Sequence, residues 1–402
     1  MADIYQTGVI TTLHLLGDKG TRVIEEELEK YSRKIRTSLL IPATYADYQK
    51  PAMKNIMSLL SEVNYINQVL IVLGKAREED FLKVKREIRE YPYRITVLWL
   101  EHPQVKMLIK ELEDADLYVG PDGKGRAVWF GVGLLLGQGE TDVIALHDSD
   151  ILTYSHTMLS RLIYPVVNPH IGFEFSKGFY ARFSHKIHGR VTRLFLIPLV
   201  RALKTITGGH PFLDYLDSFR YPLAGEFAMK ADLARVIRIP GDWGLEVGIL
   251  SEVYRNVAIK RIVQVELCQR YDHKHQPLSK EDPNAGLHKM AVDIAVNLLR
   301  NLSARGVIVN EGRLLTLRTT YLRIAEDMIA RFHADAMINA LEFDRHEEEL
   351  AVETFANALR IACEQFLEDP LAIPLTPNWS RITSVFPDYL DRLMKAVVEA
   401  NN

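Results

Sequence analysis

The chain has little of several features that mark special classes of protein. Its 402 residues include two cysteines, Cys268 and Cys363, which excludes a disulfide framework and suits a reducing cytoplasm. No apolar run approaches the roughly 20 residues that span a bilayer, and the N-terminal stretch MADIYQTGVITTLH lacks the basic-then-apolar order of a secretory signal. A formal net charge of -3 gives no general attraction to nucleic acid or to an anionic membrane. We therefore expect a cytoplasmic protein.

Short apolar runs alternate with helix-length stretches in the first part of the chain. The runs lie at 37–41, 68–73, 95–100 and 143–146, with helix-length stretches near 50–64, 78–91, 105–114 and 126–138. This order predicts a parallel, helix-covered sheet, in which right-handed crossovers place the carboxyl ends of the strands along one rim. Further strands are expected at 171–180 and 258–267.

The apolar pattern changes along the chain and predicts three regions. Residues 1–35 are expected to form an N-terminal helical arm, 36–285 the α/β domain, and 286–402 a helical C-terminal region, where apolar residues recur at helical spacing. The acidic string DRHEEEL at 344–350 is interpreted as a solvated helix face rather than a site.

The triplet Asp148-Ser149-Asp150 directly follows the apolar run at 143–146. In an open α/β sheet, ligands collect at the carboxyl ends of the strands. Two carboxylates at such a position suit a hard divalent cation, which a nucleotide diphosphate would require. The alternative is a solvated pair of aspartates in a turn or at a helix N-terminus.

A glycine-rich segment, Gly123-Lys124-Gly125, opens an apolar helix upstream of the triplet. Glycines let the backbone approach a phosphate closely, a helix N-terminus favours negative charge, and lysine adds a cation. A simple turn is the alternative. The segment is not a Walker loop, because the first glycine and the Ser/Thr after the lysine are missing.

Three further segments carry residues suited to binding. The turn Leu223-Ala224-Gly225 and Glu246 could accept hydrogen bonds from sugar hydroxyls, although Glu246 could equally be a first-turn residue stabilised by the helix dipole. His273, after the last predicted strand, could complete a metal shell or could be merely hydrogen-bonded. The segment 189–192, GRVT, offers an arginine, a hydroxyl and free backbone donors for a phosphate or carboxylate, or simply a helix cap.

Taken together and in this order, these segments resemble the retaining glycosyltransferases that make glucosyl-3-phosphoglycerate, which have the nucleotide-sugar-binding GT-A fold. The similarity spans roughly residues 36–278. The strings that carry it are PAT at 42–44, GKG at 123–125, DSD at 148–150, GRVT at 189–192, PLAGEF at 222–227, GDWGLEVG at 241–248 and the first histidine of DHKHQPL at 272–278.

The resemblance implies a fold and a reaction. The fold would be α/β, a GT-A Rossmann-like mixed sheet with an added C-terminal helical region, its nucleotide-binding part at 36–150 and its acceptor-binding part at 151–285. The reaction would move glucose from an NDP-glucose, with UDP-glucose expected, to the 2-hydroxyl of 3-phospho-D-glycerate. The acceptor would attack the same face of the sugar that the diphosphate leaves. A homodimer is expected, with no nucleic acid and no membrane as partner.

The resemblance also implies roles for individual residues. Glu246, Asp148 and Asp150 would be catalytic, and Asp150 and His273 would hold a divalent metal, Mg²⁺ with Mn²⁺ or Co²⁺ as alternatives. The nucleotide would contact Pro42, Ala43, Thr44, Gly74, Lys124 and Ser149. The sugar would contact Leu223, Ala224, Gly225 and Glu246. The acceptor would contact Gly189, Arg190, Val191, Thr192 and His275.

Departures from the family pattern leave the donor open. The family's second strand often ends in a DSGSTD-like turn, whereas this chain has Leu73-Gly74-Lys75-Ala76. The histidine segment has one residue more than expected, so Arg270 cannot be equated with the family's arginine. LGKAREED and DWG are also similar to mannosylglycerate synthases, which gives the alternative of a mannosyltransferase that uses GDP-mannose and makes mannosylglycerate or mannosyl-3-phosphoglycerate.

Overall fold

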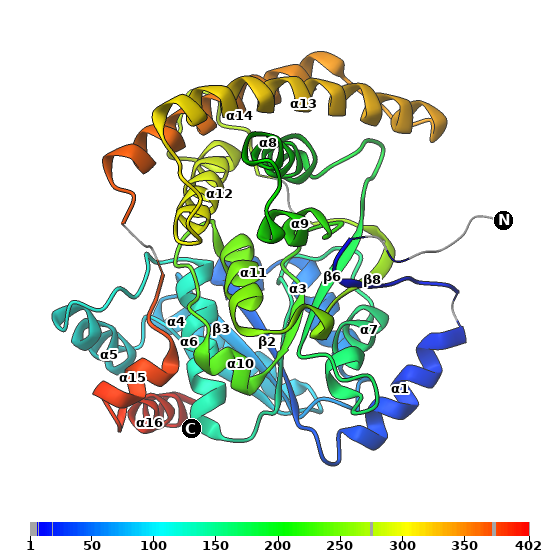
Figure 1. The fold of residues 1–402 in the computed structure, drawn as a ribbon. Coiled ribbons are helices and arrows are strands. Elements are labelled where there is room, and N and C mark those ends of the chain that lie inside the picture. Colours follow the sequence, from blue (N-terminus) through cyan, green and yellow to red (C-terminus); the bar gives the residue numbers. More distant parts are fainter. Residues whose placement is uncertain (1–5, 7, 18, 274–275, 372–374, 402) are drawn as a thin grey trace.

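The computed structural model describes residues 6, 8–17, 19–273, 276–371 and 375–401 (Figure 1). Within them the strands form one sheet, in the order β1-β8-β6-β7-β5-β2-β3-β4. The strands are β1 (Thr11–Leu13), β2 (Thr37–Thr44), β3 (Gln68–Gly74), β4 (Ile95–Trp99), β5 (Val143–Leu146), β6 (Phe175–Arg182), β7 (Phe227–Lys230) and β8 (Ile262–Tyr271). Neighbouring strands are parallel, except that β7 runs antiparallel to β5 and β6. The predicted mixed α/β sheet is confirmed.

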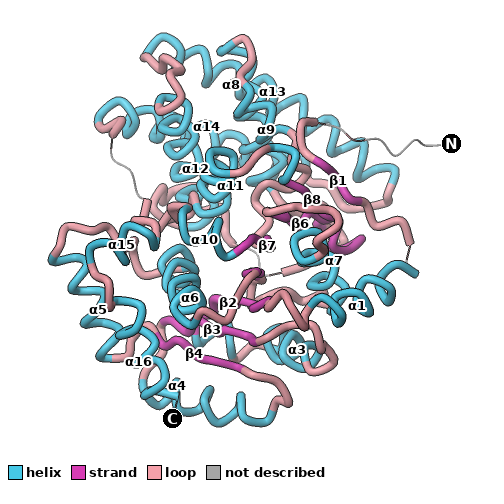
Figure 2. The backbone as a smooth tube through the Cα atoms, turned by 60° about the horizontal axis from the view of Figure 1, so that its bottom comes forward, coloured by secondary structure: helices cyan, strands magenta, loops and turns pink. Residues whose placement is uncertain are grey.

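Both faces of the central strands are buried, because side chains alternate between two apolar clusters. On β2 and β3, Leu40 and Val72 belong to one cluster, whereas Leu39 and Ile71 belong to the other. The helices on the first face include α5 (Pro103–Asp114), α6 (Lys124–Gln138) and α11 (Leu245–Asn256), and those on the second include α3 (Pro51–Leu60), α4 (Glu78–Glu87) and α7 (His156–Val167) (Figure 2). Burial on both sides explains why these strands are continuous apolar runs in the sequence.

The segment after residue 286 is helical, as predicted, but it packs in two places. Its first helices pack on α8 and α11, and its last two return to α6 and β4 (Figure 1). The helices are α8 (Ile197–Thr207), α9 (Pro211–Asp217), α12 (Gly286–Ser303), α13 (Glu311–Ile338), α14 (Arg345–Glu368), α15 (Trp379–Val385) and α16 (Tyr389–Asn401). Trp379 stacks on Trp129 of α6 with ring centroids 4.3 Å apart. No helix in the described part of the chain combines the length and apolar character needed to cross a membrane.

The N-terminal segment contains more than the predicted helix α1 (Lys19–Tyr31), because β1 pairs in parallel with β8. A three-residue strand is too short to give a periodic pattern, so the sequence did not reveal it. Strands β6 and β8 each begin four residues later than predicted; the turn η3 (Ile259–Arg261) precedes β8. The remaining elements are α2 (Tyr45–Tyr48), η1 (Ile88–Glu90), the π-helix η2 (Val191–Leu196) and α10 (Ala231–Val236).

The edge strand β4 is capped by the side chain of Asn401. Its amide accepts a hydrogen bond from the Val97 N–H at 3.2 Å and donates to the Val97 carbonyl at 2.8 Å, as a neighbouring strand would. We expect Asn401→Ala to lower the free energy of unfolding by about 1–2 kcal/mol, since two hydrogen bonds are lost. Urea denaturation measures this, with Asn339→Ala, an exposed residue at the end of α13, as the control. Equal stability of wild type and Asn401→Ala would show that the edge needs no cap.

Candidate active site

The carboxyl ends of β2, β3 and β5 meet at one rim, as the parallel order requires. Thr44 and Gly74 are partners in the register of β2 and β3, so the predicted nucleotide residues Pro42, Ala43, Thr44 and Gly74 lie side by side. Thr44 also caps α2, accepting a hydrogen bond from the Asp47 N–H at 3.1 Å. Ser149, after β5, is buried. The fold brings these residues together; their contact with a nucleotide stays a prediction.

Asp148, Asp150 and His273 form a group that could hold a metal ion. Their ligand atoms all lie within 4.8 Å of one another, and His273 Nδ1 is 3.6 Å from Asp150 Oδ1. The histidine reaches the triplet because Ile151 forms a β-bridge with His273. Two carboxylate oxygens and one imidazole nitrogen fit a divalent cation such as Mg²⁺ or Mn²⁺. The distant histidine predicted from the sequence therefore stands beside the acidic pair.

Lys124 links the triplet to Glu246. Its Nζ lies 2.6 Å from Asp148 Oδ1 and 3.1 Å from Glu246 Oε1. Burial alone would lower the pKa of Lys124, but the two carboxylates raise it above its ordinary value, so the amine is an ammonium. Burial would raise the pKa of Asp148, yet Lys124 holds it below its ordinary value. The segments GKG, DSD and GDWGLEVG thus converge on one charged cluster.

The second glycine of GKG makes this convergence possible. A Cβ at Gly125 would lie 2.4 Å from the Pro240 carbonyl oxygen and 2.9 Å from the Gly241 Cα. Only glycine lets the start of α6 approach the 240–241 backbone so closely, and this approach carries Lys124 towards Glu246. Gly123, by contrast, is the N-cap of α6, and a Cβ there would meet open space.

The Leu223–Gly225 turn lies directly against the triplet. Leu146 of β5 is paired with Phe227 of β7, so the turn before β7 arrives where β5 ends. A Cβ at Gly225 would lie 2.3 Å from Asp148 Oδ2, which explains the glycine. The predicted sugar-binding turn and Glu246 therefore flank the carboxylates from two sides.

Two residues that hold this turn were not predicted from the sequence. Glu226 is fully buried and accepts hydrogen bonds from the hydroxyls of Tyr180 and Tyr271, both at 2.7 Å. Lys177 of β6 is also buried and donates a hydrogen bond to the Ala224 carbonyl. The sequence signal for Lys177 was a lone cation inside an apolar strand, because a buried charge needs a partner. Tyr271 lies two residues before His273, so the same network holds the turn and the segment that carries the histidine predicted to bind a metal.

Lys177 makes the stability of the protein depend on pH. Burial lowers its pKa from 10.5 to about 8. Between these values the unfolded chain binds more protons than the folded one, so this residue makes the free energy of unfolding rise with pH. We expect the free energy of unfolding of wild type, minus that of Lys177→Met, to increase by about 1–3 kcal/mol from pH 8 to pH 10.5. Denaturation curves across this range, with exposed Lys54→Met as the control, test this; a constant difference would contradict it.

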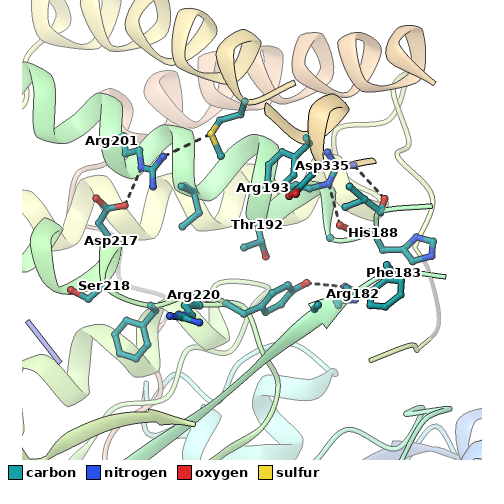
Figure 3. A pocket seen from close by; sticks show the side chains of 18 of the residues that line it. Arg182, Phe183, His188, Thr192, Arg193, Arg201, Asp217, Ser218, Arg220 and Asp335 are labelled. Carbon is teal, nitrogen blue, oxygen red and sulfur yellow. Dashed lines mark hydrogen bonds and ion pairs between the residues drawn. The ribbon is translucent and has the colours of Figure 1, made fainter. Parts of the chain in front are cut away.

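The GRVT segment lines a cavity of about 940 Å³ between β6, α8, α9 and α13 (Figure 3). Gly189 has a positive φ of 75°, and Thr192 is buried, with a hydroxyl that has no hydrogen-bond partner within the described residues. Arg190 is held by α14: its Nε lies 3.0 Å from Glu348 Oε1, and its Nη2 contacts Glu347. His275, the other predicted acceptor residue, lies outside the described residues. The acceptor role of this segment stays a prediction.

The interpretation of residues 344–350 as a solvated helix face is wrong for Glu348. This residue is 4% exposed and bridges Arg190 of the GRVT segment and Arg193, which follows that segment. Only tertiary packing of α14 against η2 determines this burial, so no local pattern in the sequence could indicate it.

The arrangement suits one kind of chemistry. A cation-binding group and an ammonium lie at a rim where strand ends offer backbone to a nucleotide, which suits a diphosphate. The carboxylate of Glu246 and the Leu223–Gly225 turn beside them suit a polyol. A separate cavity, lined by Arg182 at the end of β6, contains the Thr192 hydroxyl, which has no hydrogen-bond partner among the described residues.

Comparison with known proteins gives full-length relatives. The chain is 46% identical to glucosyl-3-phosphoglycerate synthase of Persephonella marina, over 402 residues that cover 100% of both chains. It is 39% identical to the enzyme of that name from Methanococcoides burtonii, covering 98% of this chain and 97% of that one. No model of a protein family matches the chain.

Solved structures share the fold. The crystal structure of glucosyl-3-phosphoglycerate synthase from Mycobacterium tuberculosis in complex with Mg²⁺ and UDP is 22% identical, with a TM-score of 0.53, and covers 76% of this chain and 89% of that one. The complex of that enzyme with phosphoglyceric acid gives a TM-score of 0.54 at 20% identity and covers 76% and 90%. The GT-A fold expected from the sequence is therefore confirmed. On the strength of its full-length relatives, this chain belongs to the glucosyl-3-phosphoglycerate synthase family of glycosyltransferases.

Proposed function

We propose that this chain transfers glucose from UDP-glucose to the 2-hydroxyl of 3-phospho-D-glycerate, with retention at the anomeric carbon and with a divalent metal. The relatives that carry the name of this activity support the acceptor and the sugar. Structures of the Mycobacterium tuberculosis enzyme contain Mn²⁺, UDP-glucose and phosphoglyceric acid, which supports the donor and the metal. The observation that carries the proposal is the Asp148–Asp150–His273 group beside Lys124 and Glu246.

The chain's own residues have distinct tasks in this proposal. Asp148, Asp150 and His273 would hold the metal, which would supply Lewis-acid stabilisation of the diphosphate charge. Lys124 keeps Asp148 ionised and places a second positive charge at the same point. Glu246 and the Leu223–Gly225 turn would orient the glucose hydroxyls, and Glu226 with Lys177 keeps that turn in place.

The bond changes balance without an enzyme nucleophile. The bond between C1 of glucose and the β-phosphate oxygen breaks, and a bond forms between C1 and the acceptor 2-oxygen on the same face. The proton of the acceptor hydroxyl passes to the departing phosphate oxygen. Glu246 would stabilise the positive charge that develops on the sugar ring.

A mannosyltransferase is the second candidate. The turn LGKAREED at the end of β3 and the DWG segment, which are similar to mannosylglycerate synthases, favour it. UDP-glucose, GDP-glucose and GDP-mannose should each be combined with 3-phosphoglycerate and with glycerate in the presence of Mg²⁺. The proposal predicts the highest kcat/KM for UDP-glucose with 3-phosphoglycerate, and ¹H NMR should give an α-anomeric product. A clear preference for GDP-mannose would replace it with the second candidate, and no turnover of any pair would refute both.

We also propose a cytoplasmic homodimer. The two thiols, Cys268 and Cys363, are free, which suits a reducing compartment. The helices α13 and α14 form an outer layer (Figure 1), and α13 carries the exposed apolar residues Leu315 and Leu322, with Ile308 exposed just before it. Light scattering after gel filtration distinguishes a dimer from a monomer of 45.9 kDa.

A further inference from the structure

The cavity beside the GRVT segment contains a guanidinium that has no counter-charge among the described residues. Arg182 is the last residue of β6 and lines the cavity. Its Nη1 donates a hydrogen bond to the Tyr221 hydroxyl at 2.9 Å, and its Nε is buried without a partner among the described residues. Within the described part of the chain, no carboxylate lies within ion-pair distance of Arg182. A partly buried cation without an anion is unfavourable unless a ligand supplies the anion.

Of the other arginines and lysines that line the cavity, all but Arg220 are paired with carboxylates. Arg193 is paired with Glu348, Arg201 lies 3.2 Å from Asp217, and Lys204 lies 3.0 Å from both Asp214 and Asp217. Arg220 is exposed, lies over the Phe179 ring at 5.1 Å, and contacts the ring of His14. Arg182 is therefore the cation in this wall that is both recessed and available to an anion.

Arg182 faces the same space as the GRVT segment. Figure 3 shows the Thr192 hydroxyl pointing into the cavity above the hydrogen-bonded pair of Arg182 and Tyr221. A Cβ at Gly189 would lie 3.1 Å from the Tyr221 hydroxyl, so the glycine turn closes the gap between the two walls. The unpartnered Thr192 hydroxyl and the uncompensated Arg182 are thus two independent signs of one polar ligand.

Arg190 is less available than its place in the motif suggests. Its Nε and Nη2 are both engaged by the α14 glutamates, and this fixes its guanidinium against α14. A ligand anion in the cavity must therefore find its charge-assisted contact elsewhere, and guanidinium groups bind phosphates and carboxylates in a two-pronged geometry.

We propose that Arg182 binds an anionic group of the acceptor, opposite Gly189 and Thr192, and so helps to determine acceptor specificity. This inference rests on the proposed function, because it takes the three-carbon acceptor with its carboxylate and phosphate as the ligand. Tyr221 is a positioning residue that holds the Arg182 guanidinium at the cavity wall.

The test compares Arg182→Gln with wild type. We expect the KM for 3-phosphoglycerate to rise about 10- to 100-fold, as the loss of a charge-assisted contact predicts, while the KM for UDP-glucose changes less than about threefold. Arg182→Lys should keep part of the affinity for 3-phosphoglycerate, because it retains the positive charge but lacks the two-pronged donor geometry of the guanidinium. Arg201→Gln is the matched control from the same cavity: it removes an arginine whose charge Asp217 already compensates, so acceptor binding should stay unchanged.

The acceptor panel identifies the group that Arg182 binds. If it binds the phosphate, the loss should be small with glycerate; if it binds the carboxylate, the loss should be small with glycerol 3-phosphate. Either pattern supports the proposal. An unchanged KM for 3-phosphoglycerate in folded Arg182→Gln, or a parallel rise for donor and acceptor, would overturn it. If the glutamine variant does not fold, the same criteria apply to Arg182→Lys.

A binding readout separates this inference from the proposed function. Calorimetric titration of wild type and Arg182→Gln with 3-phosphoglycerate, without donor, should show weaker binding in the variant. Should wild type bind 3-phosphoglycerate but not transfer glucose to it, the proposed function fails while the role of Arg182 stands. Should wild type transfer glucose and both variants bind the acceptor as tightly as it does, the role of Arg182 fails alone.

Discussion

Replacing Asp150 by alanine should reduce glucose transfer by about 10³-fold or more at any practical metal concentration. The change removes one of three ligand atoms that lie within 4.8 Å of one another. Metal stabilisation of a departing phosphoryl group contributes several kcal/mol, and each 1.4 kcal/mol corresponds to a tenfold change in rate. The fold should survive, because the Asp150 side chain is part-exposed and its loss relieves repulsion with Asp148.

Two measurements on Asp150→Ala test this. Initial rates of UDP release, taken over a range of Mg²⁺ and Mn²⁺ concentrations, give the loss of activity, and electron paramagnetic resonance gives the affinity for Mn²⁺. The control is Asp122→Ala, which removes an exposed aspartate just before α6 and should match wild type in both. A wild-type rate in Asp150→Ala would mean that the triplet is a turn and holds no metal.

Replacing Lys124 by methionine should lower kcat/KM for the nucleotide sugar by about 10- to 100-fold. The ammonium lies 2.6 Å from Asp148 and 3.1 Å from Glu246, and both carboxylates are largely buried. Without it, the site loses a cation at the predicted diphosphate position and keeps two uncompensated charges. Binding of the acceptor, which we propose to occur in the cavity beside the GRVT segment, should change little.

The pH dependence gives this second prediction a specific signature. Lys124 holds the pKa of Asp148 below its ordinary value, so removing Lys124 should raise that pKa. A protonated carboxyl cannot hold a cation, and the acidic limb of the kcat/KM profile should therefore move to higher pH in Lys124→Met. The control is Lys106→Met, an exposed lysine of α5. An unshifted acidic limb would show that Asp148 does not depend on Lys124.

The parts of the site that the sequence predicted follow from local patterns and sheet topology. Strand ends in a parallel sheet must share one rim, so Pro42, Leu73 and Asp148 could be placed along it from apolar runs alone. His273 follows a strand that runs parallel to β6 and so ends near the same centre. Gly125 of the GKG string and Gly225 of the PLAGEF string were informative, because at both positions another segment passes too close for a Cβ.

The parts that it did not predict depend on contacts between distant segments. Glu226 is buried between tyrosines of β6 and β8, and Glu348 of α14 reaches back to Arg190 and Arg193. Neither residue differs in its local sequence from an ordinary acidic residue on a surface. Strand β1 could not be predicted either, because three residues are too few to show a periodic pattern. Contacts between distant segments, rather than local periodicity, determine these features.

The central claim, that glucose transfer requires a divalent metal, is tested most directly by removing the metal. The protein should be stripped with EDTA, mixed with UDP-glucose and 3-phosphoglycerate, and followed by ¹H and ³¹P NMR before and after Mg²⁺ is restored. We expect no glucosyl-3-phosphoglycerate before Mg²⁺ is added, and steady formation of the α-anomer with an equimolar amount of UDP afterwards. Full activity of the stripped protein, with Mg²⁺ adding nothing, would contradict it.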